Sequence, residues 1–152
     1  MSRSRVQEAP PSKMRGIILS QIRRWSRGGG DVVVLIAAVR AGLPMAELVD
    51  LRDALDLPME RVAAKIGMSR ATFHRRQKTG VLSSDESDKA LRLARILGHA
   101  ISIFENEEMA RQWLNSPQPA LGGEVPLDFA ETEIGAREVE HLLGRIDYGV
   151  YT

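Results

Sequence analysis

The chain has 152 residues, of which 43% are hydrophobic and 27% are charged, and it contains no cysteine. This composition is typical of a folded globular protein, and it excludes wholesale disorder, a disulfide framework and thiolate metal sites. The net charge of +1 hides a division: the first 104 residues carry 18 Lys and Arg against 10 Asp and Glu, whereas residues 105–152 carry 3 against 10. A basic half beside an acidic half indicates two different partners, although charges also solubilise ordinary surfaces.

Glycine, proline and capping residues divide the chain into helical segments. Residues 1–13 are expected to form a flexible tail, and Asp31 is expected to cap a helix through Arg40. The run 32–34 (VVV) also has the β-propensity of a short strand. Further helices are predicted at 14–27, 45–55, 58–66, 69–78, 86–104, 107–114, 126–129 and 132–148. No strand pair is predicted, so we expect an all-α fold, with one helical domain over 14–104 and a smaller one over 105–152.

The segment 59–78 has the pattern of a helix-turn-helix. Gly67 follows the small Ala63 by four residues, which lets two short helices approach closely around a tight turn. Val62, Ile66 and Phe73 are expected to form the apolar wedge between them. In this motif the second helix enters the major groove of DNA with its early residues at base edges.

The charges support this interpretation, because the stretch from Arg61 to Ser84 has six basic residues and no acidic one. Within it, Arg70 and Arg75 are expected to reach guanine edges, and Arg76 and Lys78 to contact phosphates. The predicted DNA-binding residues are Ser69, Arg70, Thr72, His74, Arg75, Arg76 and Lys78.

One position departs from the usual motif. Three residues after the position of Phe73 the motif has another apolar residue, and here that residue is Arg76. A helical hairpin whose charges only face water therefore stays as the alternative for this segment.

The sequence contains no convergent set of catalytic residues. Its three histidines, His74, His99 and His141, lie on separate predicted helices, which argues against a metal site. Glu138 and Glu140 are two residues apart on a predicted helix and point in different directions, so paired-acid catalysis is not indicated. We expect a protein that is not an enzyme and that holds neither a metal nor a cofactor.

The acidic half carries a more specific pattern. The tract ARQWLNSPQPALGGEVPLD at 110–128 and the ending LLGRIDYGVY at 142–151 resemble the toxin-binding domain of the Xre/ParS/MbcA family of antitoxins. Upstream, Arg75-Arg76, Gly80, Leu82 and Glu86-Ser87 resemble the Xre-type helix-turn-helix of that family and the helix after it. The resemblance spans about residues 45–152.

The resemblance implies a function. Such antitoxins neutralise a cognate RES-type toxin, which attacks NAD, by covering its active site, and they repress their own promoter, usually as dimers. The implied partners are a RES-type toxin, operator DNA and a second copy of the chain, with no membrane. No signal peptide or apolar run long enough to span a membrane is evident in the sequence, so we expect a cytoplasmic protein that is nucleoid-associated when bound to DNA.

The C-terminal residues are the expected toxin contacts. Aromatic and Arg side chains are enriched at binding hot spots, which favours Arg145, Tyr148, Gly149 and Tyr151. Two alternatives stay open here: Arg145 can simply complement the helix dipole, and the tail can be a frayed terminus. The alternative function for the whole chain is a plain helix-turn-helix regulator whose C-terminal half dimerises or senses a ligand.

Overall fold

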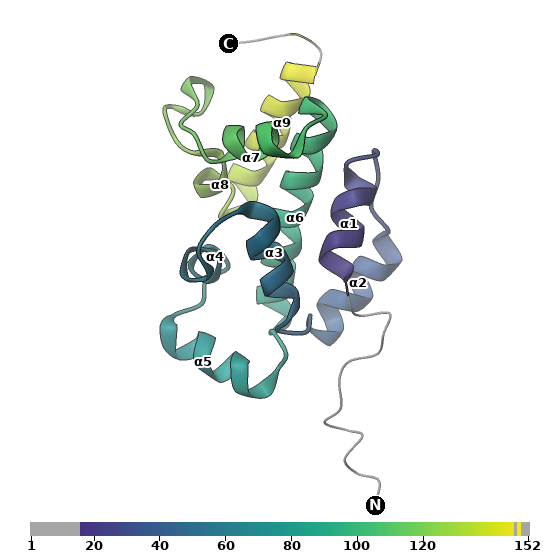
Figure 1. Cartoon of the computed structure of the whole chain (residues 1–152), viewed down its shortest axis with the longest axis vertical. Coiled ribbons are helices and arrows are strands. Elements are labelled where there is room, and N and C mark those ends of the chain that lie inside the picture. The colour runs from purple at the N-terminus through teal and green to yellow at the C-terminus, as the bar shows by residue number, and fades with distance from the viewer. Residues whose placement is uncertain (1–15, 148, 150–152) are drawn as a thin grey trace, which may run out of the picture.

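A computed structural model describes residues 16–147 and 149 of the chain, and the regular secondary structure of these residues is helical (Figure 1). The elements are α1 (Ile17–Trp25), α2 (Val32–Ala41), α3 (Glu47–Leu55), α4 (Met59–Lys65), α5 (Arg70–Thr79), α6 (Ser84–Phe104), α7 (Glu107–Leu114), the 3-10 helix η3 (Pro119–Leu121), α8 (Pro126–Phe129) and α9 (Glu133–Asp147). The described part of the chain has two isolated β-bridges but no strand, so the predicted all-α fold class is confirmed. None of its helices is both long and apolar enough to cross a bilayer.

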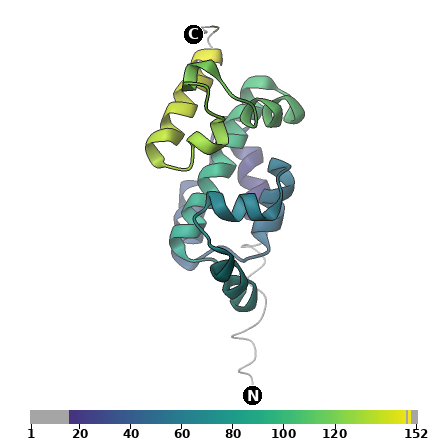
Figure 2. The ribbon, with the colours of Figure 1, turned by 90° about the vertical axis from the view of Figure 1, so that its left-hand side faces the viewer.

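The 21-residue helix α6 runs through the middle of the molecule (Figure 1). It contacts α1, α2 and α3 from the basic half and α7 and α9 from the acidic half, and its apolar side chains join both halves in one hydrophobic core. The helix α5 lies at one end of the elongated molecule, and α9 reaches the other end (Figure 2). The division into domains at residue 104 stays a prediction.

Local side-chain caps fix where α2, α5, α6 and α7 begin. The Asp31 carboxylate accepts a hydrogen bond from the backbone N–H of Val34 at 3.2 Å, so the segment 32–34 starts a helix and the alternative of a strand there is wrong. Helix α6 begins two residues before its predicted start, because Ser83 and Glu86 form a reciprocal capping box. Helix α1 begins later than predicted, at Ile17.

Two buried charged groups tie distant segments together. The Glu47 carboxylate of α3 accepts hydrogen bonds from the backbone N–H groups of Gly16 and Ile18, each at 2.8 Å. It therefore satisfies donors that the first turn of α1 leaves free. Lys65 of α4, whose side chain is only 4% exposed, pairs with Asp128 of α8 and lies 3.4 Å from Glu131. Because the end of α4 and the region of α8 share this ammonium group, the two halves are linked by charge as well as by the core.

A third ionic cluster joins α6 to α9. The Arg95 guanidinium donates to the Glu140 carboxylate at 2.8 Å and 3.2 Å, and His99 Nδ1 lies 3.0 Å from the same carboxylate. Burial alone would raise the pKa of Glu140, but the hydrogen bonds from His99 and Arg95 outweigh it and hold that pKa below its ordinary value. Glu140 is thus an anchor of the C-terminal helix, and its partners on α6 account for its position.

Gly98 of α6 is packed so closely against α1 that a side chain at this position is expected to destabilise the protein. A Cβ at Gly98 would lie 2.5 Å from Cβ of Trp25 and 3.0 Å from the carbonyl oxygen of Ile22, whereas a Cβ at Gly144 meets nothing within 4 Å. We expect Gly98→Ala to destabilise the protein by about 1–2 kcal/mol, because overpacking outweighs the gain in helix propensity. The matched change Gly144→Ala should stabilise it by about 0.5–1 kcal/mol. Urea unfolding measures both, and equal stabilisation by the two changes would contradict the described contact of α1 with α6.

Candidate nucleic-acid interface and partner-binding surface

The turn between α4 and α5 has the geometry that the sequence predicts. Gly67 adopts a φ of +82°, a conformation that favours glycine. Val62 and Ile66 are buried, and Phe73 is half-buried against the same core. Ser69 then caps α5, since its hydroxyl oxygen accepts a hydrogen bond from the backbone N–H of Thr72 at 3.1 Å.

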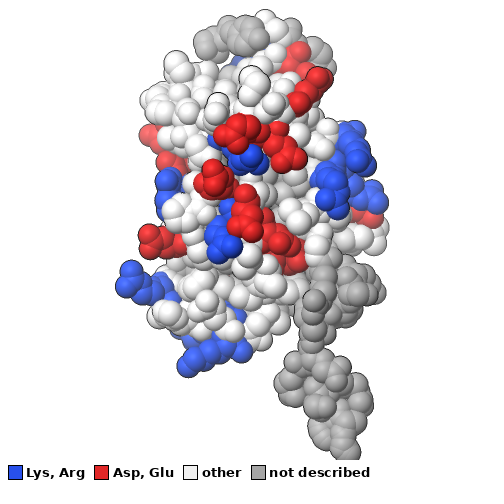
Figure 3. Space-filling view, in the orientation of Figure 1, with Lys and Arg blue, Asp and Glu red and all other residues white. Residues whose placement is uncertain are grey.

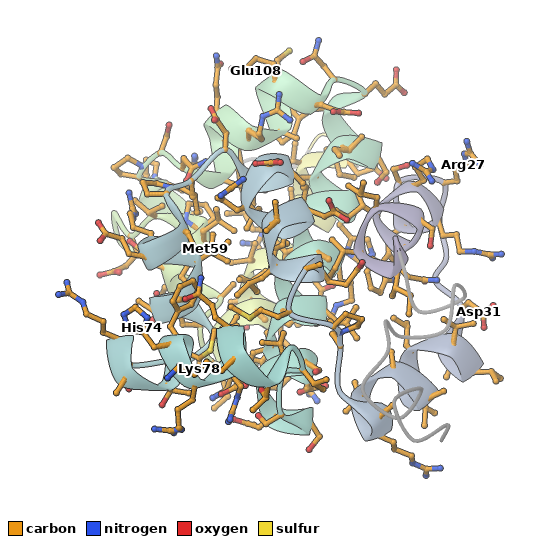
Figure 4. The ribbon with its side chains drawn as sticks, turned by 60° about the horizontal axis from the view of Figure 1, so that its bottom comes forward. Arg27, Asp31, Met59, His74, Lys78 and Glu108 are labelled. Carbon is orange, nitrogen blue, oxygen red and sulfur yellow. The ribbon has the colours of Figure 1, made fainter. Side chains whose placement is uncertain are left out.

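Helix α5 presents an uninterrupted basic and polar surface to solvent. None of its ten residues is buried. Arg70, His74, Arg75 and Lys78 are all exposed, and Figure 4 shows His74 and Lys78 side by side along this helix. The tip of the molecule at α5 shows basic side chains and no acidic ones in Figure 3, in contrast to the acidic band across the middle of that face. This distribution suits a phosphate backbone.

The first turns of α5 are ordered by their own side chains. The Ser69 hydroxyl lies 3.1 Å from Oγ1 of Thr72, and the Arg75 guanidinium donates to that same oxygen at 3.2 Å. These residues are spaced three apart and therefore share one face of the helix. Arg75 is thus held against the helix with much of its guanidinium still free to bind a ligand.

Arg76 differs from the other predicted DNA-binding residues. Its guanidinium donates to both carboxylate oxygens of Glu86, at 2.7 Å and 3.2 Å, and the two side chains are 24% and 9% exposed. This bidentate pair joins the second half of α5 to the start of α6 and takes the place of the apolar contact that the motif usually has there. The structure therefore places Arg76 in an internal ion pair, apart from the exposed basic residues Arg70, Arg75 and Lys78, which we call the exposed basic row. The predicted phosphate contact of Arg76 stays untested.

The pKa values of this pair reflect their contact. Burial alone would raise the pKa of the Glu86 carboxyl, but hydrogen bonds from Arg76 and from the backbone N–H of Ser83 outweigh it, so that pKa is lowered. The hydrogen bond with Glu86 in turn raises the pKa of Arg76. Glu86 thus serves both as part of the α6 cap and as the anchor of α5.

Backbone contacts also fix the far end of α5. The N–H of Met45 donates to the carbonyl of Gly80, and the N–H of Leu82 donates to that of Leu43, each at 2.8 Å. A side chain at Gly42 would lie 2.3 Å from the Leu82 carbonyl oxygen, so glycine is required for this close approach. The loop after α5 is consequently held by the loop before α3.

The acidic half forms a compact surface around α7, η3, α8 and α9. Leu114 and Leu121 are buried, and the half-buried Trp113 packs on Phe104 with a centroid distance of 5.8 Å. Gly122 and Gly123 both have positive φ angles, so this loop requires their conformational freedom. The most specific tract of the sequence therefore serves mainly to shape this surface.

Of the predicted toxin-binding residues, Arg145 lies in α9, and the other three follow this helix in the sequence. Arg145 is in the last turn of that helix, half-buried, and its Nε atom is buried without a hydrogen-bond partner among the described residues. Gly149 is exposed, and Tyr148 and Tyr151 lie outside the described residues. The proposed contacts of these four residues stay predictions.

The structural roles of Glu86 and Lys65 were not predicted, for different reasons. The pattern Ser83-Ser-Asp-Glu86 is a capping-box signature that could have identified Glu86. No local signal marks Lys65 as buried, because both of its partners lie more than 60 residues away in the chain.

Two segments of the chain match known families over much of its length. Residues 34–95 match the antitoxin Xre-like helix-turn-helix domain, and residues 99–149 match the antitoxin Xre/MbcA/ParS C-terminal toxin-binding domain. The chain belongs to the Xre/MbcA/ParS family of antitoxins. The resemblance found in the sequence and the assignment of a helix-turn-helix are thereby confirmed. The two matched domains are thus a helix-turn-helix domain and a toxin-binding domain.

Similar proteins support the same family over most of the chain. An antitoxin Xre from Yersinia enterocolitica is 28% identical over 121 residues, which cover 78% of this antitoxin and 82% of that protein. An antitoxin Xre from Photorhabdus laumondii is 29% identical over 118 residues, with 76% and 80% covered. A Sphingobium protein named Prs ADP-ribosylating antitoxin is 25% identical over 126 residues, with 76% and 79% covered.

The lowered pKa of Glu86 gives a prediction for the anchor of α5. A carboxylate whose pKa is lower in the folded state contributes stability above its unfolded pKa, about 4.3, and this contribution is lost as the pH falls through the folded pKa. We therefore expect Glu86→Gln to lower the free energy of unfolding at neutral pH, with the difference from the original protein narrowing as the pH falls below about 4. Urea unfolding across this pH range measures it.

The matched control for this experiment is Glu60→Gln on the exposed side of α4, which has no ion pair among the described residues. It should leave stability nearly unchanged over the same range. A loss for Glu86→Gln that is as large at low pH as at neutral pH would contradict the ionic anchor.

Proposed function

We propose that this antitoxin represses its own promoter by placing α5 in the major groove of operator DNA. The observation that carries the proposal is the capped helix α5, whose exposed face presents Arg70, Arg75 and Lys78 with no acidic residue on the helix. Bidentate contacts of Arg with guanine supply sequence recognition, whereas Lys and phosphate contacts supply affinity that depends on salt. The match to an Xre-like helix-turn-helix domain over residues 34–95 supports it.

The neutralising activity is assigned to the acidic half. We propose that residues 105–152 bind a RES-type toxin that degrades NAD and cover its active site, with Arg145 and the residues after Asp147 as the central contacts. The supporting observations are the match to a toxin-binding domain over 99–149 and the excess of acidic residues, which complements a basic nucleotide-binding cleft. Because one relative is named for Prs and ADP-ribosylation, the toxin assay should follow ADP-ribose transfer as well as loss of NAD.

DNA recognition is tested by changing the exposed basic row of α5. Arg70→Ala and Arg75→Ala should each weaken binding to a duplex from the antitoxin's own promoter by about 1–3 kcal/mol, which is roughly fivefold to 160-fold, as measured by fluorescence anisotropy. Lys78→Ala should lower the salt slope of binding by about one. Arg76→Ala should lower that slope less, because its guanidinium already binds Glu86.

The charge-matched control is Arg137→Ala on α9, whose side chain is 69% exposed at a distance from α5 along the chain. It should leave promoter affinity unchanged. If a protein with both Arg70 and Arg75 changed to Ala still binds the promoter with unchanged affinity, the assignment of α5 as the recognition helix is wrong.

Toxin neutralisation is tested by co-expression with the product of the neighbouring reading frame. The complete antitoxin should form a stable complex that suppresses NAD loss and ADP-ribose transfer. Truncation after Asp147 should weaken capture of the toxin at least tenfold, because it removes two aromatic residues of the kind that dominate binding hot spots. Circular dichroism should show the truncated chain fully folded. Complete protection by the truncated chain would refute the role of the tail.

A further inference from the structure

The start of α1 is firmly fixed to the body of the molecule. Gly16 and Ile18 donate their backbone N–H groups to the buried carboxylate of Glu47, each at 2.8 Å. The side chains of Ile17 and Ile18 are themselves buried in the core. A buried carboxylate is costly without its hydrogen-bond donors, so this contact holds the start of α1 in place. The chain that precedes Gly16 therefore leaves the molecule at this one point.

This point is tied to the C-terminal end of α5. Two residues before Glu47, the N–H of Met45 donates at 2.8 Å to the carbonyl of Gly80, the residue that ends α5. One short segment, residues 45–47, therefore holds the start of α1 with one end and the end of α5 with the other. In Figure 1, α1 runs from this junction away from the end of the molecule that carries α5.

The sequence before this point is basic. Residues 1–15 lie outside the described part of the chain, and they contain four basic residues and one acidic residue. The basic residues form two pairs on either side of Pro10-Pro11, namely Arg3 with Arg5 and Lys13 with Arg15. With few apolar side chains to bury, the segment suits a partner of opposite charge rather than a hydrophobic groove.

We propose that residues 1–15, which we call the N-terminal arm, bind DNA beside the site of α5. Arg3 and Arg5 enter the neighbouring minor groove, because narrow A·T-rich minor grooves have a strong negative potential that attracts arginine. Lys13 and Arg15 neutralise phosphates between this groove and α5. The inference rests on the DNA binding proposed for α5, and it adds a preference for A·T pairs that α5 does not contact.

The dimensions of DNA and of the arm permit this contact. A recognition helix has its early residues at base edges, so the C-terminal end of α5, near Lys78, lies toward the rim of the major groove. The minor groove follows about half a helical turn away, roughly 17 Å along the duplex. An extended chain covers up to about 3.3 Å per residue, so the segment from Arg5 to Arg15 spans up to about 36 Å. Arg5 therefore reaches the minor groove while Gly16 keeps its place.

The place where the arm joins the molecule favours DNA over the toxin. The toxin is proposed to bind at the end of α9, which lies toward the opposite end of the molecule from α5 (Figure 2). The cleft proposed for the toxin is basic, and it would repel an arm of the same sign. DNA bound to α5 is both close to the arm and of opposite charge.

The first test compares matched pairs of arginines in the complete chain by fluorescence anisotropy over a range of salt concentrations. The arm variant, Arg3→Ala with Arg5→Ala, should lower the salt slope of promoter binding by about two and weaken binding roughly tenfold at physiological salt. The α1 control, Arg23→Ala with Arg24→Ala, removes the same charge from exposed positions in the last turn of α1. It should leave both values nearly unchanged, because that turn is at the end of α1 away from Gly16.

The base pairs that flank the footprint of the arm variant distinguish a minor-groove contact from a general attraction to phosphate. In the minor groove, G·C differs from A·T by the amino group of guanine, and inosine lacks this group. The unchanged protein should bind duplexes with A·T or inosine·C flanks equally well and duplexes with G·C flanks more weakly. The arm variant should bind all three duplexes alike.

Cysteine chemistry locates the arm directly, since the chain has no cysteine of its own. An iron–EDTA group on Ser4→Cys should cleave the promoter beside the α5 site, with the offset between strands that is characteristic of attack from the minor groove. The same group on Met109→Cys, a 52%-exposed position of α7, should not cleave it above background.

Several outcomes would overturn the proposal. These are an unchanged salt slope in the arm variant, an equal loss in the α1 control, equal binding of the unchanged protein to all three duplexes, and cleavage from Ser4→Cys no stronger than from Met109→Cys. Loss of toxin capture in the arm variant without any change in DNA binding would assign the arm to the toxin instead.

The failure of this proposal and the failure of α5 as the recognition helix give different results. If α5 does not read the operator, Arg70→Ala and Arg75→Ala leave promoter affinity unchanged, while the arm variant still lowers the salt slope. If the arm does not bind DNA, the arm variant behaves as the unchanged protein, while the changes in α5 still weaken binding.

Discussion

The structure depends on one long helix, against which both halves of the chain pack in a single hydrophobic core. The apolar side chains of α6 are buried against α1, α2 and α3 on one side and against α7 and α9 on the other. Because close-packed interiors transmit displacement rather than absorb it, the helix-turn-helix and the toxin-binding half cannot shift independently without disturbing this packing. The Lys65 contacts with Asp128 and Glu131 add a second link between α4 and the region of α8. The antitoxin is therefore one body, with the two proposed interfaces toward opposite ends (Figure 2).

Its charges divide into two groups with different tasks. The exposed basic residues of α5 face solvent and are available to a polyanion. Lys65, Arg76 and Arg95, in contrast, bind carboxylates of other segments and hold those segments in place. The excess of basic residues in the first half thus overstates the surface that can bind DNA, because part of that charge is neutralised inside the chain.

Local signals in the sequence account for most of the fold. Asp31, Ser69 and Ser83 cap helices within three residues of themselves, and Gly67 and Gly80 mark turns by their left-handed conformations. These features act over short distances, which is why the helical pattern and the helix-turn-helix could be predicted. The cap of α1 by Glu47, the burial of Lys65 and the pairing of Arg76 depend on tertiary contacts, which neither periodicity nor capping rules report. The exposure of Val32, Val33 and Ile36 on α2 was also beyond prediction, since an apolar helix ordinarily implies burial.

The most direct test of two independent interfaces on one rigid chain is a titration of toxin into the complex of antitoxin with promoter DNA. Light scattering after size-exclusion chromatography would give the mass of each species. We expect a single complex that contains DNA, antitoxin and toxin, because α5 and the end of α9 lie toward opposite ends of the molecule (Figure 2). Release of DNA as toxin binds, with no species that contains all three, would contradict the separation of the two interfaces.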